Sequence, residues 1–276
     1  MEGTAQDKVR NPLLITGASG SMGKVATQAM AQEGYPILMA CRNLQKGETV
    51  RQEILKAVPE AQLELIELDL SRQTSVREMV ARLDGRKLSG IFNNAGIISR
   101  RYSLTEDGIE HSMAVNYLNP TLLTRLLLPN LEEKGHIVNM VSISRFISRL
   151  TIDWPEQGAE NFQQLRTYAN GKMAFLYFTL GLARRYPQFI VNMSDPGVVN
   201  SNMISMGRWF DPLADIFFRP FIKTPEQGAQ SALNALHATE GIHYYVGKGY
   251  KPVPKRYLES PLVDELWEQA TQLLNL

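Results

Sequence analysis

Cysteine is nearly absent from the sequence, which has one, Cys41, among 276 residues. A single thiol excludes an internal disulfide framework and any metal site built from several cysteines. The histidines are also few, and their scatter shows no metal-ligand spacing (His111, His136, His237 and His243). The sequence therefore predicts no metal site, and Cys41 is expected to fill the end of a strand rather than to react.

Long apolar runs and an excess of one charge are missing as well. No run of 18 apolar residues occurs, so no membrane span is predicted, and the polar residues 1–10 lack the apolar core of a signal peptide. The formal net charge is +1 at pH 7, which gives no overall basic field for nucleic acid and no acidic tail. We therefore expect a cytoplasmic protein whose partner is a small molecule.

What is present is an alternation of strand-like and helical patterns. Hydrophobic residues make up 44% of the chain, and apolar runs fall at 12–15, 35–41, 63–70, 88–92, 135–142, 188–193 and 243–246. Strands separated by helices indicate a parallel sheet with right-handed crossovers. No linker or repeat divides the chain. The sequence therefore predicts an α/β fold: one domain over 1–276, a Rossmann-type doubly wound parallel sheet of about seven strands with helices on both faces.

Three stretches need separate interpretation. Residues 104–131 are expected to form a long helical region, and 258–276 a closing helix. Residues of about 144–166 follow no period and are expected to form an insertion loop over the ligand crevice, which in such sheets lies outside the carboxyl ends of the strands.

A glycine-rich turn joins the first strand to the first helix. Its candidate ligand-binding residues are Gly17, Ser19, Gly20, Ser21, Met22 and Gly23. A turn of this kind brings backbone N–H groups and the positive end of a helix up to a phosphate. The alternative is a tight strand–helix turn with no ligand.

Later strand ends carry further candidates for a dinucleotide site. Arg42 and Asn43 follow the second strand, where an acidic residue would hold a ribose diol and an arginine accommodates a 2′-phosphate. No carboxylate is adjacent, so the sequence favours NADP(H) over NAD(H), the alternative being a solvated arginine. Asp69 is expected either to face the adenine or to cap a helix beginning near Ser71. Small residues at 93–96 allow a flat ligand to approach the backbone.

Tyr168 and Lys172 suggest the chemistry. In a helix they are i and i+4 and share one face. A nearby ammonium favours the phenolate, so Lys172 is expected to lower the pKa of Tyr168. Such a phenol can pass a proton to or from an oxygen while a nicotinamide carries the hydride. The alternative is an exposed helix that shows this spacing by chance.

These motifs together resemble the short-chain dehydrogenase/reductase family over nearly the whole chain. They occur in the family's order at 16–23, 41–43, 69–70, 93–96, Asn116, Ser142, 168–172 and 195–201. Within the family the chain is most similar to the retinol dehydrogenase and protochlorophyllide reductase-like group. The cues for that group are the strand end Ala-Cys-Arg-Asn, the wide gap from Ser142 to Tyr168, and the sequence Thr-Pro-Glu-Gln-Gly-Ala at 224–229.

The resemblance implies a role for each matching residue. Tyr168 would be the general acid/base, Lys172 would lower its pKa and hold the nicotinamide ribose, and Ser142 would orient the substrate oxygen. Asn116 would anchor a water relay from Lys172. The remaining cofactor-binding residues would be Asp69, Leu70, Asn94, Ala95 and Gly96 on the adenosine side and Pro196, Gly197, Val199 and Ser201 around the nicotinamide.

The chain departs from the family in the glycine-rich turn. Ser21 stands where the family usually has a glycine, and Gly20 lies one place earlier, so the turn also fits a G-x-x-G-x-x-G spacing. The Ser21 side chain could crowd a pyrophosphate or hydrogen-bond to it. Met22 replaces the usual isoleucine, which is a tolerable exchange.

The expected activity is that of an NADP(H)-dependent oxidoreductase acting on a CH–OH group or its carbonyl. The segment at about 200–223 is rich in Met and aromatic residues and is expected to form a substrate lid, which favours a bulky apolar, retinoid- or steroid-like substrate. An ordinary packed lid or a dimer or membrane-surface contact is the alternative. Other readings are a non-catalytic NADP(H)-binding redox sensor and a carbon–carbon double-bond reductase. Both a monomer and a homodimer are compatible with the sequence.

Overall fold

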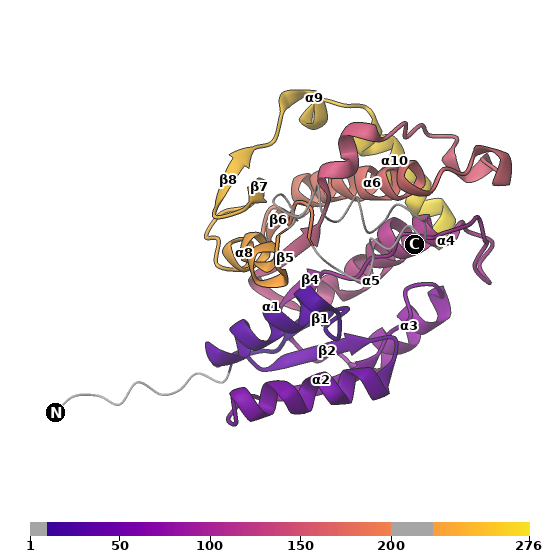
Figure 1. Cartoon of the computed structure of the whole chain (residues 1–276). Coiled ribbons are helices and arrows are strands. Elements are labelled where there is room, and N and C mark those ends of the chain that lie inside the picture. Colours follow the sequence, from indigo (N-terminus) through magenta and orange to yellow (C-terminus); the bar gives the residue numbers. More distant parts are fainter. Residues whose placement is uncertain (1–9, 200–222) are drawn as a thin grey trace.

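The computed structural model describes residues 10–199 and 223–276. Its centre is an eight-stranded sheet with strand order β3-β2-β1-β4-β5-β6-β7-β8 (Figure 1). All neighbouring strands pair in parallel except β7 and β8. The bounds are β1 Leu13–Thr16, β2 Ile37–Cys41, β3 Leu63–Glu67, β4 Leu88–Asn93, β5 Leu131–Met140, β6 Ile190–Asp195, β7 His243–Val246 and β8 Gly249–Pro252.

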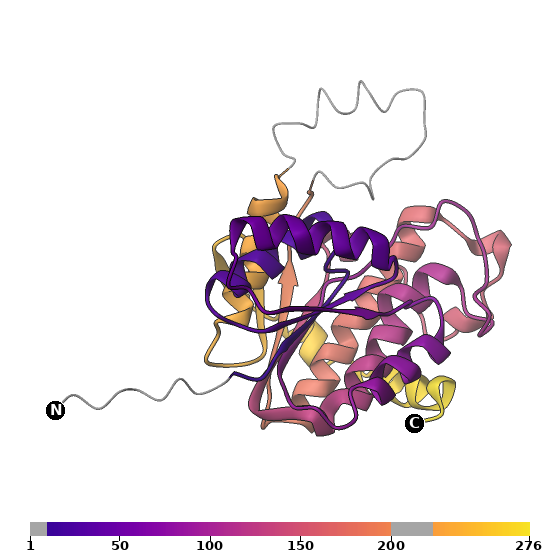
Figure 2. The same ribbon diagram turned by 90° about the horizontal axis from the view of Figure 1, so that it is seen from below.

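Helices cover both faces of this sheet, so the predicted fold class is confirmed (Figures 1 and 2). One face packs against α1 (Ser21–Gln32), α2 (Leu44–Ala57) and α8 (Pro225–Leu236). The other packs against α3 (Gln73–Arg82), α5 (Asn119–Leu127), α6 (Gln164–Arg185) and α10 (Leu262–Leu274). The strands between these layers are almost wholly apolar because both of their faces are buried.

The strand order places a crevice beside β1. The chain leaves β1 toward β2 on one side and returns to β4 on the other, so the connections diverge above the carboxyl ends of β1 and β4. Doubly wound sheets bind ligands at such a switch point. The turn at Gly17 follows β1 and the segment at Asn94 follows β4, so both flank it.

The predicted helical region at 104–131 is confirmed from His111 to Asn130, but it is not one regular helix. Leu104 forms an antiparallel bridge with Glu110, and the helical part is divided into α4 (His111–Met113), a π-helical turn (Ala114–Leu118), α5, and a 3₁₀ turn (Leu128–Asn130). Pro120 explains the division: it has no N–H to donate to the carbonyl of Asn116, so regular α-helical bonding cannot pass this point.

The predicted closing helix at 258–276 is α10, which begins at Leu262 directly after Pro261. The short α9 (Lys255–Leu258) precedes it. The region predicted as an insertion loop contains three 3₁₀ turns, Ile143–Ile147, Trp154–Glu156 and Ala159–Asn161. It is tied to α10 through Trp154 Nε1, which donates to Gln269 Oε1 at 2.7 Å. Of the helices in the described part of the chain, none combines the length and apolar character that a bilayer crossing needs.

Candidate active site

The glycine-rich turn is held by close backbone packing. Gly17 has φ of +64°, which favours glycine, and its carbonyl accepts from Gly20 N at 2.9 Å. A Cβ on Gly23 would lie 2.2 Å from the Gly17 carbonyl oxygen, so α1 can approach the turn only with glycine at this position. Gly20 is the N-cap of α1 and supplies no side-chain acceptor, so the amide groups of the first turn are left for another partner.

A cavity of about 430 Å³ lies above this turn, within the range typical of small-molecule sites. It brings together most of the predicted cofactor-binding residues. Its lining includes Gly17, Ser19, Gly20, Ser21, Met22, Gly23, Arg42, Asn43, Asp69, Leu70, Asn94, Ala95 and Gly96. Thr16, Lys46, Leu68, Ile97 and Val115 also line it and were not selected from the sequence.

Thr16 connects the two strand ends that flank the cavity. Its hydroxyl oxygen accepts from the backbone N–H groups of Asn94 and Ala95, each at 3.0 Å. The Asn94 side chain donates in return to the carbonyls of Thr16 at 2.9 Å and Gly17 at 3.2 Å. Asn94 therefore fixes the shape of the turn from the neighbouring strand.

Two cations stand at the edge of the cavity. Arg42 and Lys46 are both exposed, and Asn43 between them caps α2 by accepting from Lys46 N at 2.8 Å. The capping contact sets the spacing of the cations because it fixes where α2 begins. The sequence signal for Lys46 was its position four residues after Arg42.

Asp69 lines the cavity but does not cap a helix. Its Oδ1 accepts from Ser71 N at 2.9 Å and Ser71 Oγ at 2.8 Å, which stabilises the turn after β3. Helix α3 begins at Gln73, close to the predicted start near Ser71, but its N-cap is Arg72, and the Gln73 N–H donates to Asp107 Oδ2 at 2.9 Å. The helix-capping alternative for Asp69 is therefore wrong.

Ser142 and Tyr168 meet at the carboxyl end of β5. Ser142 is the N-cap of the 3₁₀ turn that follows the strand, and its hydroxyl oxygen accepts from Ser144 N at 3.1 Å. Burial raises the pKa of Tyr168 to about 12, the hydrogen bond with Ser142 opposes this, and the negative charge of Asp195 adds to it. The phenol is therefore protonated throughout the neutral range and is set up as a proton donor.

Lys172 is 3% exposed, and its Nζ donates to the Met140 carbonyl oxygen at 2.9 Å. Burial lowers its pKa to about 8, while the charge of Asp195 opposes this. Desolvation determines the net direction of the Tyr168 pKa in this structure, and a lowering of that pKa by Lys172 stays a prediction. The shared helix face is real, but the ammonium is directed at a strand carbonyl.

Asn116 lies in the π-helical turn and is fully buried. Its Oδ1 accepts from Ile97 N at 3.1 Å, and its Nδ2 donates to the carbonyls of Ile97 and Ser112, each at 2.8 Å. A Cβ on Gly96 would lie 2.8 Å from Asn116 Oδ1 and 3.3 Å from Lys172 Nζ. Asn116 and Lys172 thus converge on the cavity residue Gly96, and the water relay stays a prediction.

The turn after β6 carries the remaining predicted contacts. Gly197 has φ of +74° and its N–H donates to Asp195 Oδ1 at 2.8 Å, while Lys223 Nζ donates to the Pro196 carbonyl at 3.0 Å. Val199 is buried, and a Cβ on Gly228 would meet both Val199 and the Met22 sulfur. This turn therefore lies beside the start of α1.

Ser201 and most of the predicted lid, residues 200–222, are outside the described residues.

An ion pair next to these residues was not selected from the sequence. Arg145 and Asp195 are 3.1 Å apart, and Tyr244 hydrogen-bonds to both. The charge of Asp195 affects the pKa of both Tyr168 and Lys172, so the pair belongs to the surroundings of the candidate site.

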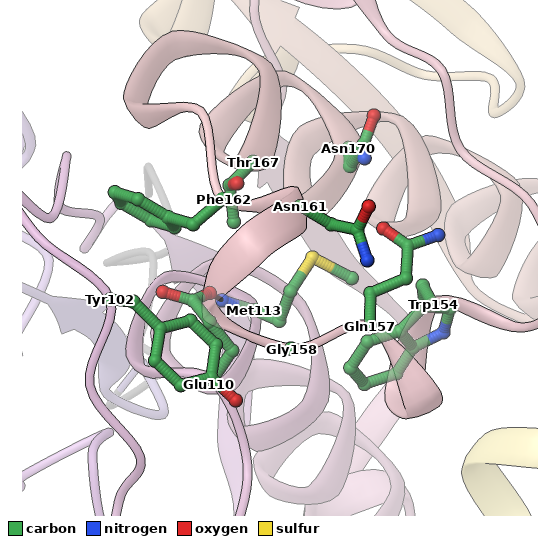
Figure 3. Close-up of a pocket in the computed structure, with 10 residues that line it drawn as sticks. All are labelled: Tyr102, Glu110, Met113, Trp154, Gln157, Gly158, Asn161, Phe162, Thr167 and Asn170. Carbon is green, nitrogen blue, oxygen red and sulfur yellow. Dashed lines mark hydrogen bonds between the residues drawn. The ribbon is translucent and has the colours of Figure 1, made fainter.

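A second cavity lies beside the start of α6 (Figure 3). The rings of Tyr102 and Phe162 lie at one end and Trp154 at the other, with the Gln157 and Asn161 amides between them. Its volume is about 30 Å³, which holds one or two water molecules and no bulky substrate. Within 10–199 and 223–276, no three side chains among His, Cys, Asp and Glu are grouped to hold a metal ion.

Comparison with known proteins gives one family. The family model described as short chain dehydrogenase matches residues 11–208. Human retinol dehydrogenase 11 is 33% identical over 278 residues, covering 96% of this chain and 86% of the relative. Human polyprenol dehydrogenase is 28% identical, covering 94% of this chain and 84% of the relative.

Solved structures agree on the fold. A crystal structure of an uncharacterised protein from Mycobacterium paratuberculosis superposes with a TM-score of 0.78 at 25% identity, covering 99% of this chain and 98% of the other. A short-chain dehydrogenase from Sphingobium yanoikuyae in complex with NADPH gives a TM-score of 0.64 at 20% identity, covering 85% and 87%.

Proposed function

The chain belongs to the short-chain dehydrogenases, and from this premise we propose that it is an NADP(H)-dependent oxidoreductase that interconverts a carbonyl and an alcohol on a bulky apolar substrate. The observation that carries the proposal is the meeting of three features at one sheet edge. They are a cavity of about 430 Å³ over a glycine-rich turn, two cations at its rim, and a protonated phenol paired with Ser142 beside it.

The cavity suits a dinucleotide because its floor is backbone. Gly17, Gly20 and Gly23 leave no side chains where α1 meets β1, and a methyl group at Gly23 would collide with the Gly17 carbonyl. The uncapped start of α1 offers amide donors to a pyrophosphate. We propose that the adenosine side is bordered by Asp69 and Ala95.

Arg42 and Lys46 support NADP(H) over NAD(H). An NAD-selective site holds the ribose diol with a carboxylate, and here that edge of the cavity carries a guanidinium and an ammonium. Guanidinium groups bind phosphate through paired donors, and lysine adds a point charge. The positive charges of these two side chains would compensate the negative charge of a 2′-phosphate bound between them.

Removing both cations should therefore weaken NADPH binding selectively. We expect the double variant Arg42→Ala/Lys46→Ala to raise the Kd for NADPH about 100-fold and that for NADH less than about threefold, since charge-assisted hydrogen bonds contribute about 1.5–3 kcal/mol each. Titration of nucleotide fluorescence measures both constants. Lys56→Ala, at the far end of α2, is the matched control. An equal loss for the two nucleotides would contradict the assignment.

The proposed chemistry divides between the nucleotide and the chain. A bound nicotinamide would supply or accept the hydride at the carbonyl carbon. In reduction, the Tyr168 hydroxyl gives its proton to the carbonyl oxygen as negative charge develops there, and the Ser142 hydroxyl orients that oxygen. Lys172 would hold the ribose and, through its charge, favour the phenolate that remains. In oxidation the same proton returns to Tyr168.

Apolar side chains near Ser142 support a lipophilic substrate. Ile143, Phe146 and Val198 are 46%, 64% and 45% exposed, and they belong to the segments that directly follow β5 and β6. Two relatives are named for retinol and polyprenol, both long apolar alcohols. We propose that this apolar rim contacts the substrate.

A carbonyl panel tests the proposal. With NADPH followed at the absorbance of the reduced nicotinamide, we expect turnover of retinoid, polyprenal or steroid carbonyls and little turnover of small polar ketones. Turnover confined to the small polar ketones would reject the substrate class. NADPH binding without turnover of any carbonyl would favour a redox sensor.

A further inference from the structure

The charged cluster formed by Arg145, Asp195 and Tyr244 joins three adjacent strands. Arg145 lies in the 3₁₀ turn after β5, Asp195 ends β6, and Tyr244 is the second residue of β7. Arg145 Nη1 donates to Asp195 Oδ2 at 3.1 Å, to the Ser142 carbonyl at 3.4 Å, and to the Tyr244 hydroxyl, which in turn donates to Asp195. One guanidinium therefore joins Ser142 to the turn after β6.

The cluster is withdrawn from solvent. The side chains of Arg145 and Asp195 are 15% and 3% exposed. Burying an ion pair carries a desolvation cost, and apolar side chains of similar volume often give equal or greater stability. Its presence at a catalytic edge therefore points to a use other than stability.

Asp195 also holds the turn after β6, since its Oδ1 accepts from Gly197 N at 2.8 Å. Its negative charge opposes ionisation of Tyr168 and favours the charged form of Lys172, both on α6. The other charged or titratable groups around it are Arg145 and Tyr244, with Lys223 on the adjoining Pro196 carbonyl and Tyr257 near Tyr244. Arg145 is thus the cation that is paired directly with Asp195.

We propose that Arg145 is a positioning residue for the reaction: it holds the Ser142 loop against the turn at Pro196–Gly197 and limits the field that Asp195 exerts on Tyr168 and Lys172. This inference rests on the proposed function, since it assigns a role at the same site. It requires that the two members of the ion pair have opposite electrostatic effects. A purely structural pair would instead give two variants with the same defect.

The test compares Arg145→Met with Asp195→Asn. Losing the guanidinium raises the pKa of the phenol and of the Lys172 ammonium, and losing the carboxylate lowers both. The pH at which carbonyl reduction falls off on the alkaline side should therefore move up in Arg145→Met and down in Asp195→Asn, by about one unit each. Arg145→Lys should lie between Arg145→Met and the parent protein.

The measurement is kcat from pH 6 to 11 with NADPH and all-trans-retinal, a range that contains the Lys172 midpoint near 8. The pH dependence of the NADPH Kd is a readout that needs no turnover. Arg149→Met, an exposed arginine on the same segment, is the control and should keep the parent midpoints. Midpoints that move in the same direction in both variants, or in neither, overturn the inference.

The two proposals fail in different ways. A parent protein that binds NADPH but reduces neither retinal nor any carbonyl of the panel rejects the proposed reaction, and the binding midpoints then decide the role of Arg145. A parent protein that binds no NADPH overturns both.

Discussion

Tyr168→Phe is expected to lower kcat for carbonyl reduction by about 100-fold or more, the usual contribution of a positioned proton donor. The ring keeps its place on α6, so the Kd for NADPH should change less than about threefold. The change removes the one hydroxyl that is hydrogen-bonded to Ser142 and held protonated by burial. Steady-state kinetics and nucleotide fluorescence separate the two effects.

Tyr250→Phe supplies the matched control, because that ring is 60% exposed on β8, at the edge of the sheet. It should retain the parent kcat and NADPH affinity. Full activity of Tyr168→Phe would remove the proposed mechanism, even if NADPH still bound.

The raised pKa of Tyr168 affects which direction of the reaction the phenol can support. A phenolate would be a ready base for alcohol oxidation, whereas the chain without ligand holds the neutral phenol, with its pKa raised to about 12. Carbonyl reduction can use this form at once. Oxidation at neutral pH would require the phenolate, which a nearby positive charge such as the Lys172 ammonium would favour.

The cavity was predictable from sequence because its parts are local. Each predicted cofactor residue follows a strand-like run, and the carboxyl ends of parallel strands meet at one edge of the sheet. Gly17 and Gly23 mark their turn without reference to the rest of the chain. Lys46 could have been found from its spacing to Arg42.

The cluster of Arg145, Asp195 and Tyr244 was not predictable, because it depends on strand order. Asp195 is 50 residues from Arg145 and 49 from Tyr244. They become neighbours only because β5, β6 and β7 are adjacent. Strand β8 was not predicted for another reason. Its four residues are all exposed and show no alternating apolar pattern, and only their pairing with β7 makes them a strand.

The same limit applies to Lys172. Spacing along a helix tells which side chains share a face, but not what that face meets. Here the facing partner is the Met140 carbonyl at the end of β5. At 104–131 the apolar pattern indicated the helical region but not its irregularities, which arise from the bridge at Leu104 and from Pro120.

Lys172→Met should abolish function while raising stability. A buried ammonium with its pKa lowered to about 8 costs folding free energy at neutral pH, because the unfolded chain holds the same proton in water. Methionine fills a similar volume without that cost. We expect kcat to fall at least about 100-fold, the NADPH Kd to rise about tenfold or more, and Tm at pH 7 to rise or stay equal.

The pH dependence of the stability difference identifies its cause. Below about pH 8 the lysine is charged in both the folded and unfolded states, so the advantage of Lys172→Met is largest there. Between pH 8 and the ordinary lysine pKa of 10.5, which applies to the unfolded chain, folding releases the proton and the advantage shrinks. Thermal melts from pH 6 to 10 measure this, with the exposed Lys251→Met as control. A Tm deficit at pH 7 would mean that the Met140 contact outweighs desolvation, and an unchanged kcat would show that this ammonium takes no part in catalysis.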